Sequence, residues 1–77
     1  METPKVVNPL AGWRRAVGLT QAEAARRWGR SQPQVARIEK VDFGSLTVRT
    51  LQAYVEALGG SLLISFSCDE DLAVLED

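Results

Sequence analysis

The chain has 77 residues, of which 45% are hydrophobic, and its formal net charge is -1. This size and composition predict a single globular domain with a small core, which pairing with a second copy would stabilise. One cysteine and no histidine argue against an internal disulfide or a zinc cluster, and no apolar stretch is long enough to span a membrane. No nucleophile–base pair or phosphate-binding loop is recognisable, so we expect a cytoplasmic protein that is not an enzyme and needs no cofactor.

Charge is distributed unevenly along the chain. Residues 9–49 contain eight arginines and lysines against three acids, a surplus of +5, whereas residues 69–77 contain five acids and no base. The near-neutral total therefore hides a basic body, of the kind that binds nucleic acid, and an acidic tail. We expect the tail, residues 68–77, to be exposed disordered chain; the alternative is that it forms part of a site for a protein partner.

Residues 8–18 (NPLAGWRRAVG) predict a first helix, with Asn8 as its N-cap and Gly18 at its C-terminal end. The two arginines of this stretch, Arg14 and Arg15, are expected on its solvated face; the alternative is that they reach the DNA backbone. The apolar face, which we expect to be buried, should contain Leu10, Trp13 and Val17.

Residues 20–29 (TQAEAARRWG) predict a second helix. Thr20 and Glu23 have the spacing of a capping box, in which the side chain of each residue hydrogen-bonds to the backbone of the other, and Gly29 ends the helix. We expect Arg26 and Arg27 on its solvated face; the alternative is that they contact DNA.

Residues 31–40 (SQPQVARIEK) predict a third helix, which begins with a second capping box of Ser31 and Gln34. Pro33 fits the first turn, where its missing N–H costs no hydrogen bond. Gln34 could instead contact a phosphate group rather than complete the cap. Two short capped helices joined by a tight turn are typical of a helix-turn-helix. The packing between them should involve Ala25, Trp28, Val35 and Ile38.

A loop at residues 40–46 precedes a fourth predicted helix at residues 47–60, capped by either Ser45 or Thr47. The apolar stripe of this helix should contain Val48, Leu51, Val55 and Leu58. Leu46 can support its start through a hydrophobic staple with Leu51. The aromatic residues expected in the core or at its rim are Trp13, Trp28, Phe43 and Tyr54.

Residues 61–67 (SLLISFS) alternate apolar and polar side chains, which predicts a β-strand. One strand cannot form a sheet alone, so we expect it to pair with the same strand of a second copy. The dimer interface would then contain Leu62, Leu63, Ile64 and Phe66.

The stretch TQAEAARRWGRSQPQVARIEK, residues 20–40, resembles the helix-turn-helix of the Cro/phage-repressor (XRE) family. The later stretch TLQAYVEALGGSLLISF is similar to the last helix and strand of small HigA/HipB-like antitoxins. The resemblance implies an all-α, lambda-repressor-like fold of four helices with a C-terminal β-strand that pairs across a dimer. The chain would divide into an N-terminal arm at residues 1–8, a DNA-binding domain at 9–60, a dimerisation strand at 61–67 and an acidic tail at 68–77.

Carried over position by position, the resemblance implies that Gln32, Pro33 and Arg37 face base edges. Glutamine can pair with adenine, arginine can pair with guanine, and the proline ring can contact a thymine methyl group. Contacts with the DNA backbone are expected from Gln21, Arg30, Ser31, Gln34, Lys40, Ser45, Thr47 and Arg49. Two positions depart from the family: Arg30 replaces a buried aliphatic residue, and Val41 replaces a common glycine.

The resemblance also implies a function. It points to a transcriptional repressor that binds double-stranded operator DNA as a homodimer, with its two recognition helices about 34 Å apart. Within that class it suggests an antitoxin that represses its own toxin–antitoxin operon and has a toxin protein as a further partner. The alternatives are a phage- or plasmid-type regulator without a toxin, and a helix-turn-helix module that docks onto protein instead of DNA.

Overall fold

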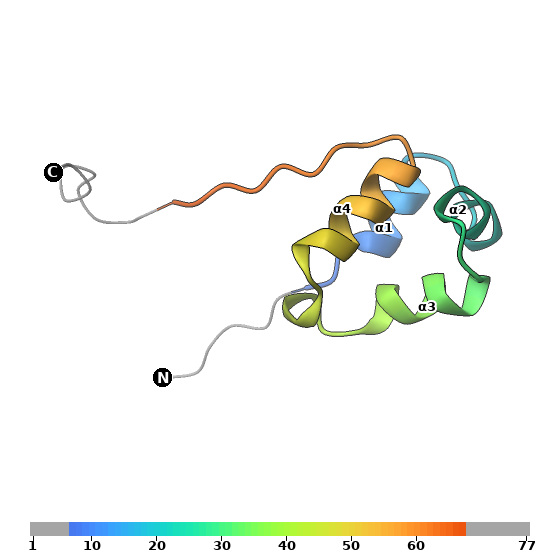
Figure 1. Cartoon of the computed structure of the whole chain (residues 1–77), viewed down its shortest axis with the longest axis horizontal. Coiled ribbons are helices and arrows are strands. Elements are labelled where there is room, and N and C mark those ends of the chain that lie inside the picture. The colour runs from blue at the N-terminus through green and yellow to red at the C-terminus, as the bar shows by residue number, and fades with distance from the viewer. Residues whose placement is uncertain (1–6, 68–77) are drawn as a thin grey trace, which may run out of the picture.

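Four short α-helices follow one another along residues 7–67, the part of the chain that the structure, a computed structural model, describes (Figure 1). They are α1 (Leu10–Ala16), α2 (Gln21–Trp28), α3 (Gln32–Lys40) and α4 (Val48–Ala57), with a 3-10 turn, η1 (Phe43–Ser45), before α4. The expected all-α class is therefore confirmed for these residues. None of the helices in this range has both the length and the hydrophobicity that crossing a membrane requires. The acidic tail and residues 1–6 lie outside the described residues.

The core forms where the four helices meet. Val35 of α3 and Tyr54 of α4 are the largest fully buried side chains. The small side chains of Ala24 and Ala25 let α2 approach α3 closely, as the helix-turn-helix prediction requires. Trp28 contacts Tyr54 edge to face, with ring centroids 5.1 Å apart. The expected packing of Ala25, Trp28, Val35 and Ile38 is confirmed, because all of them belong to or contact one apolar cluster.

Polar caps start the helices largely as the sequence predicts. The capping box of α2 is complete: the Thr20 hydroxyl accepts the Glu23 N–H at 3.1 Å, and the Glu23 carboxylate accepts the Thr20 N–H at 2.8 Å. The structure also decides between the two candidate caps of α4. It is Thr47 rather than Ser45, since the Thr47 hydroxyl accepts the Thr50 N–H at 3.1 Å.

The turn between α2 and α3 depends on Gly29, which has a left-handed backbone with φ of 74°. This conformation lets the Arg30 N–H bond to the Ala25 carbonyl at 3.0 Å and the Gly29 N–H bond to the Arg26 carbonyl at 3.3 Å. The pattern closes the last turn of α2 and redirects the chain at once into α3. A side chain at this position would strain the turn that sets the angle between the two helices.

Two of the predicted buried positions are wrong. Val17 is exposed because α1 ends at Ala16, so Val17 lies in the following turn instead of on the apolar face. Val48 is exposed because it is the first residue of α4, where the chain has not yet reached the core. The buried stripe of α4 consists of Leu51, Tyr54, Val55 and Leu58.

After α4 the chain runs in an extended path away from the helices (Figure 1). A Cβ atom at Gly60 would lie 2.5 Å from Trp13 Cζ2, so this exit passes directly against the indole of α1. Leu62 packs against the core, whereas Leu63, Ile64 and Phe66 are 88%, 52% and 97% exposed. Within residues 7–67 no segment is hydrogen-bonded as a strand, so the strand at 61–67 and its pairing stay predictions.

Candidate DNA-binding surface

The N-terminal turn of α3 faces solvent, while the opposite side of the helix is buried. Gln32, Pro33 and Arg37, the expected base-reading residues, are all exposed. Val35 and Glu39, which alternate with them along the helix, are buried. The structure therefore places all three expected readers at exposed positions of one helix: Pro33 and Arg37, four residues apart, share a face, and Gln32 is the first residue of the helix.

A second capping box fixes the start of α3. The Ser31 hydroxyl accepts the Gln34 N–H at 3.3 Å, and the Gln34 side-chain oxygen accepts from the Ser31 N–H and hydroxyl at 2.8 and 3.0 Å. Of the two interpretations of Gln34, the structure thus favours the cap for its oxygen. Pro33 is the second residue of the helix, where no intrahelical partner is lost.

A buried carboxylate holds α3 from behind. Arg14 of α1 donates from Nε and Nη2 to the two Glu39 oxygens at 2.7 and 3.2 Å. Gln21 of α2 donates to Glu39 at 3.1 Å, and the Tyr54 hydroxyl of α4 donates to it at 3.0 Å. We call Arg14, Gln21, Glu39 and Tyr54 the polar hub. It joins one side chain from each helix, and every buried side-chain nitrogen and oxygen of residues 7–67 has a hydrogen-bond partner.

The hub corrects the expectation that Arg14 lies on a solvated face. Arg14 is 6% exposed, and its guanidinium also donates from Nη1 to the Leu19 carbonyl at 2.9 Å, so most of its donors are used inside the protein. Gln21, expected to contact a phosphate, donates one N–H of its side-chain amide to Glu39 of α3. Gln21 is the first residue of α2, and its neighbours Thr20 and Ala22 are exposed, so the start of that helix lies at the surface.

Electrostatics keep the hub charged. Burial alone would raise the pKa of Glu39, but the hydrogen bonds from Arg14, Gln21 and Tyr54 outweigh it and hold the pKa below its ordinary value. The hydrogen bond to Glu39 raises the pKa of Arg14. Burial, followed by the contact with Glu39, raises the pKa of the Tyr54 phenol. Glu39 and Arg14 are therefore an ion pair at neutral pH.

The end of α3 is held by Asn8, which the sequence places at the start of the first helix instead. Pro9 occupies that N-cap, and the Asn8 oxygen accepts the Leu10 N–H at 3.0 Å. The Asn8 amide group donates to the carbonyls of Ile38 and Val41 at 2.8 and 2.9 Å. A glycine in a left-handed conformation often lets the backbone hydrogen-bond to the last carbonyls of a helix. Val41 has an extended backbone instead, and the Asn8 amide supplies hydrogen bonds at this end of α3.

Exposed cations surround α3. Arg30 precedes it, Arg37 and Lys40 lie along it, and Arg49 lies in the first turn of α4. The structure of residues 7–67 contains one ion pair, Arg14 with Glu39, so these four charges are not neutralised by acids in that range. Such unpaired guanidinium and ammonium groups favour contact with phosphates.

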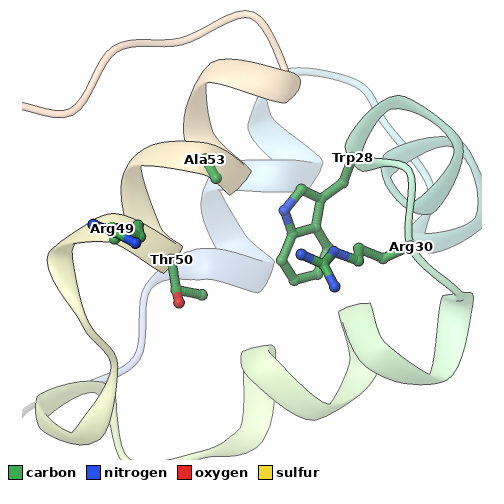
Figure 2. Close-up of a pocket in the computed structure, with 5 residues that line it drawn as sticks. All are labelled: Trp28, Arg30, Arg49, Thr50 and Ala53. Carbon is green, nitrogen blue, oxygen red and sulfur yellow. The ribbon is translucent and has the colours of Figure 1, made fainter.

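Arg30, beside Trp28, and Arg49, at the start of α4, both line one pocket (Figure 2). The Arg30 guanidinium carbon lies 5.5 Å from the centroid of the Trp28 ring, a cation–π arrangement. Arg30 occupies a position where the family usually has a buried aliphatic residue. Its side chain packs over the Trp28 ring at the edge of the core, and its charge stays at the surface.

Ser45 and Thr47, two further residues expected at the DNA backbone, make local hydrogen bonds. The Ser45 hydroxyl donates to the Asp42 carbonyl at 2.7 Å, and Thr47 caps α4. Both are exposed and lie just before α4, so the N–H groups at the start of that helix are at the surface.

Sequence reasoning missed the structural roles of Arg14, Glu39 and Asn8. A charged residue in a predicted helix is normally solvated, and the partner of Arg14 lies 25 residues further along the chain. A usable signal was the resemblance of residues 20–40, because Glu39 lies in the Arg-Ile-Glu sequence (residues 37–39) near the end of that stretch.

The sequence model of a protein family described as Helix-turn-helix domain matches residues 5–67, well over half of the chain. The chain belongs to this family. The resemblance to helix-turn-helix regulators that residues 20–40 indicate is therefore confirmed, and the turn of this helix-turn-helix domain is the one around Gly29.

The relatives of this helix-turn-helix protein include two antitoxins of Mycobacterium tuberculosis. The protein named antitoxin HigA3 is 42% identical over 65 residues, covering 83% of this chain and 60% of the relative. Antitoxin HigA2 is 40% identical over 62 residues, covering 80% of this chain and 61% of the relative. The chain thus spans about three fifths of the length of these curated relatives.

Solved structures agree with these sequence matches. A HigA antitoxin described as inducing DNA bending by a unique dimerization is 38% identical, with a TM-score of 0.72 over 91% of this chain and 92% of that one. The DNA-bound antitoxin HigA3 is also 38% identical, with a TM-score of 0.70 over 92% of this chain and 87% of the other. The resemblance to HigA-like antitoxins is confirmed at the level of sequence and fold.

Proposed function

We propose that this protein is a sequence-specific repressor that binds double-stranded operator DNA as a homodimer and serves as the antitoxin of a toxin–antitoxin operon. The observation that carries the proposal is the exposed front of α3, which the polar hub and Asn8 hold rigidly from behind. A preset helix of this kind is what reading of the major groove requires. The antitoxin part is supported by the relatives named HigA.

The residues divide into readers and anchors. Gln32, Pro33 and Arg37 are proposed to contact base edges, because all three are exposed residues of α3 and Pro33 and Arg37 share one face. The proposed backbone contacts come from side chains and helix starts around them: Gln21, Arg30, Ser31, Gln34, Lys40, Ser45, Thr47 and Arg49. The helix starts of α2, α3 and α4 lie at the surface and offer free N–H groups to phosphates.

The homodimer is proposed to form through residues 61–67. Leu63, Ile64 and Phe66 are exposed apolar side chains on an extended segment whose backbone groups have no strand partner among residues 7–67. Pairing this segment with its copy would satisfy those groups and cover the apolar side chains. The structurally similar HigA antitoxin that forms a dimer supports this proposal.

Substitution of Arg37 tests the proposal on an operator selected from random DNA with the full chain. Arg37→Ala should weaken binding to the operator by about 1–3 kcal/mol and relax the preference at one base position, since a guanidinium–guanine pair is lost. Arg26→Ala is the matched control, because Arg26 is an exposed arginine on α2 outside the proposed surface. Titration of labelled operator and of unrelated DNA measures both effects. An Arg37→Ala protein with unchanged operator affinity would instead support docking onto protein.

A further inference from the structure

A pocket of about 400 Å³ opens between the α2–α3 turn and the first half of α4 (Figure 2). Its lining consists of Trp28, Arg30, Arg49, Thr50 and Ala53. The pocket therefore combines two guanidinium groups and a hydroxyl with an indole and a methyl group. This volume is within the range of ligand sites, and the lining fits a ligand that carries carboxylates beside apolar groups.

The charged side of the pocket is partly preorganised. Arg30 is held 5.5 Å from the Trp28 ring, and Trp28 is itself fixed by its edge-to-face contact with Tyr54. Within residues 7–67 neither Arg30 nor Arg49 forms an ion pair. A carboxylate that enters the pocket would meet cationic groups without first displacing an acid of the described chain.

The acids of the described chain are already engaged elsewhere. Glu23 accepts the Thr20 N–H, Glu39 belongs to the polar hub, Asp42 accepts the Gly44 N–H, and Glu56 accepts from Gln52. Of the ten acids in the sequence, five lie in residues 69–77. The uncommitted negative charge of the protein is therefore concentrated in that segment.

We propose that this pocket binds the acidic segment 69–77 (DEDLAVLED) of the chain. The segment places four apolar residues, Leu72 to Leu75, between acidic groups, which matches the mixed lining of the pocket. A DNA phosphate could pair with the arginines but offers no aliphatic group to the indole. The segment is tethered to the described chain through Ser67, and the ten residues after Ser67 can span about 33 Å when extended.

Docking of the segment has a consequence for DNA, which rests on the function proposed above. Arg30 and Arg49 are expected to contact the DNA backbone, so a docked acidic segment and a phosphate compete for the same guanidinium groups. The segment would then act as an internal competitor that weakens binding to non-specific DNA more than binding to a true operator, where base contacts add to the affinity.

The docking is tested without DNA, on the full chain. A tail-neutral variant carries Asp69→Asn, Glu70→Gln, Asp71→Asn, Glu76→Gln and Asp77→Asn. In hydrogen–nitrogen correlation NMR spectra at low salt, neutralisation should shift the Trp28 indole N–H and the Thr50 and Ala53 amides. The same shifts should be lost when neutralisation is repeated in an Arg49→Gln background and kept in an Arg26→Gln background.

Spectra in which the pocket resonances do not respond to tail neutralisation would overturn the proposal. Shifts that persist undiminished with Arg49→Gln would overturn it too, because the segment would then affect the pocket through long-range electrostatics and not by binding at Arg49. A separate titration with DNA should show severalfold tighter non-specific binding by the tail-neutral variant at low salt, with a smaller gain in the Arg49→Gln background. If neither protein binds DNA, the proposed function fails while the NMR result still decides the docking.

Discussion

At the scale of single residues, Glu39 connects all four helices. Its carboxylate accepts hydrogen bonds from Arg14, Gln21 and Tyr54, which come from α1, α2 and α4. A charge in a small core is stabilising only when it is fully paired, and removing one partner leaves the other buried without compensation. The hub therefore ties the orientation of α3 to the integrity of the whole core.

Glu39→Gln should lower the free energy of unfolding by about 3 kcal/mol, because the buried Arg14 guanidinium loses its counter-charge. Urea denaturation followed by circular dichroism measures this loss. Glu56→Gln is the matched control, since Glu56 is exposed and bonds only to Gln52. Similar small losses in both variants would contradict the structural role of the hub.

The hub also predicts a pH dependence. Hydrogen bonds that outweigh burial hold the pKa of Glu39 below its ordinary value of 4.5, so the folded state binds fewer protons than the unfolded state. Its contribution to stability is present above the unfolded pKa and is lost as the pH falls through the folded pKa. The unfolding free energy should therefore decrease on acidification below about pH 4.5, and denaturation at a series of pH values measures it.

Glu39→Gln should flatten this dependence without abolishing it. The backbone hydrogen bond from Thr20 also lowers the pKa of Glu23, which contributes with the same sign. A Glu39→Gln protein whose stability falls with acid as steeply as that of the parent would show that Glu39 does not titrate as the structure implies.

At the scale of elements, the exit from α4 is determined by contact with α1. The chain passes so close to Trp13 that only a hydrogen atom fits on the Gly60 α-carbon, and the Gly60 N–H bonds to the Val55 carbonyl at 2.9 Å. This contact directs residues 61–67 away from the helices (Figure 1).

Gly60→Ala should destabilise the fold by about 1–3 kcal/mol, because the new methyl group overlaps the Trp13 ring and one of them must move. Gly12→Ala is an informative control. Gly12 lies inside α1, and nothing lies within 4 Å of a Cβ atom there, so alanine should be neutral or stabilising. Thermal unfolding and Trp fluorescence measure both variants, and equal stabilities would contradict the close approach at Gly60.

At the scale of the whole molecule, a single copy of the chain leaves apolar side chains exposed in residues 61–67. Phe66 is 97% exposed, which a small protein tolerates more easily when a partner covers it. A homodimer formed there would also double the phosphate contacts and match a palindromic operator.

Phe66→Ser should weaken dimerisation while the helical domain stays folded, because Phe66 makes no part of its core. Sedimentation at a series of concentrations should show dissociation at higher concentration than for the parent. Val17→Ser, at another exposed apolar position, should leave the dimer unchanged. A parent chain that is monomeric at micromolar concentration would refute the dimer proposal.

Local signals were sufficient for much of the fold. Capping boxes at Thr20 and Ser31, the glycine turn at Gly29 and the spacing of apolar residues determined where α2 and α3 begin, how they meet and which side is buried. These features depend on neighbours within about one helical turn, so the sequence alone contains them. The exposed face of α3 with Gln32, Pro33 and Arg37 followed from the same pattern.

Only the tertiary structure decided which polar residues are internal. The bonds of Arg14 to Glu39 and of Asn8 to the end of α3 join residues 25 and 30 positions or more apart, and helical periodicity carries no information about such pairs. The meeting of Arg30 and Arg49 at one pocket likewise depends on how α4 packs beside the α2–α3 turn. The sequence by itself determined the elements and the exposed side of α3, whereas long-range packing determined what holds that helix in place and which of the basic residues remain free to bind a ligand.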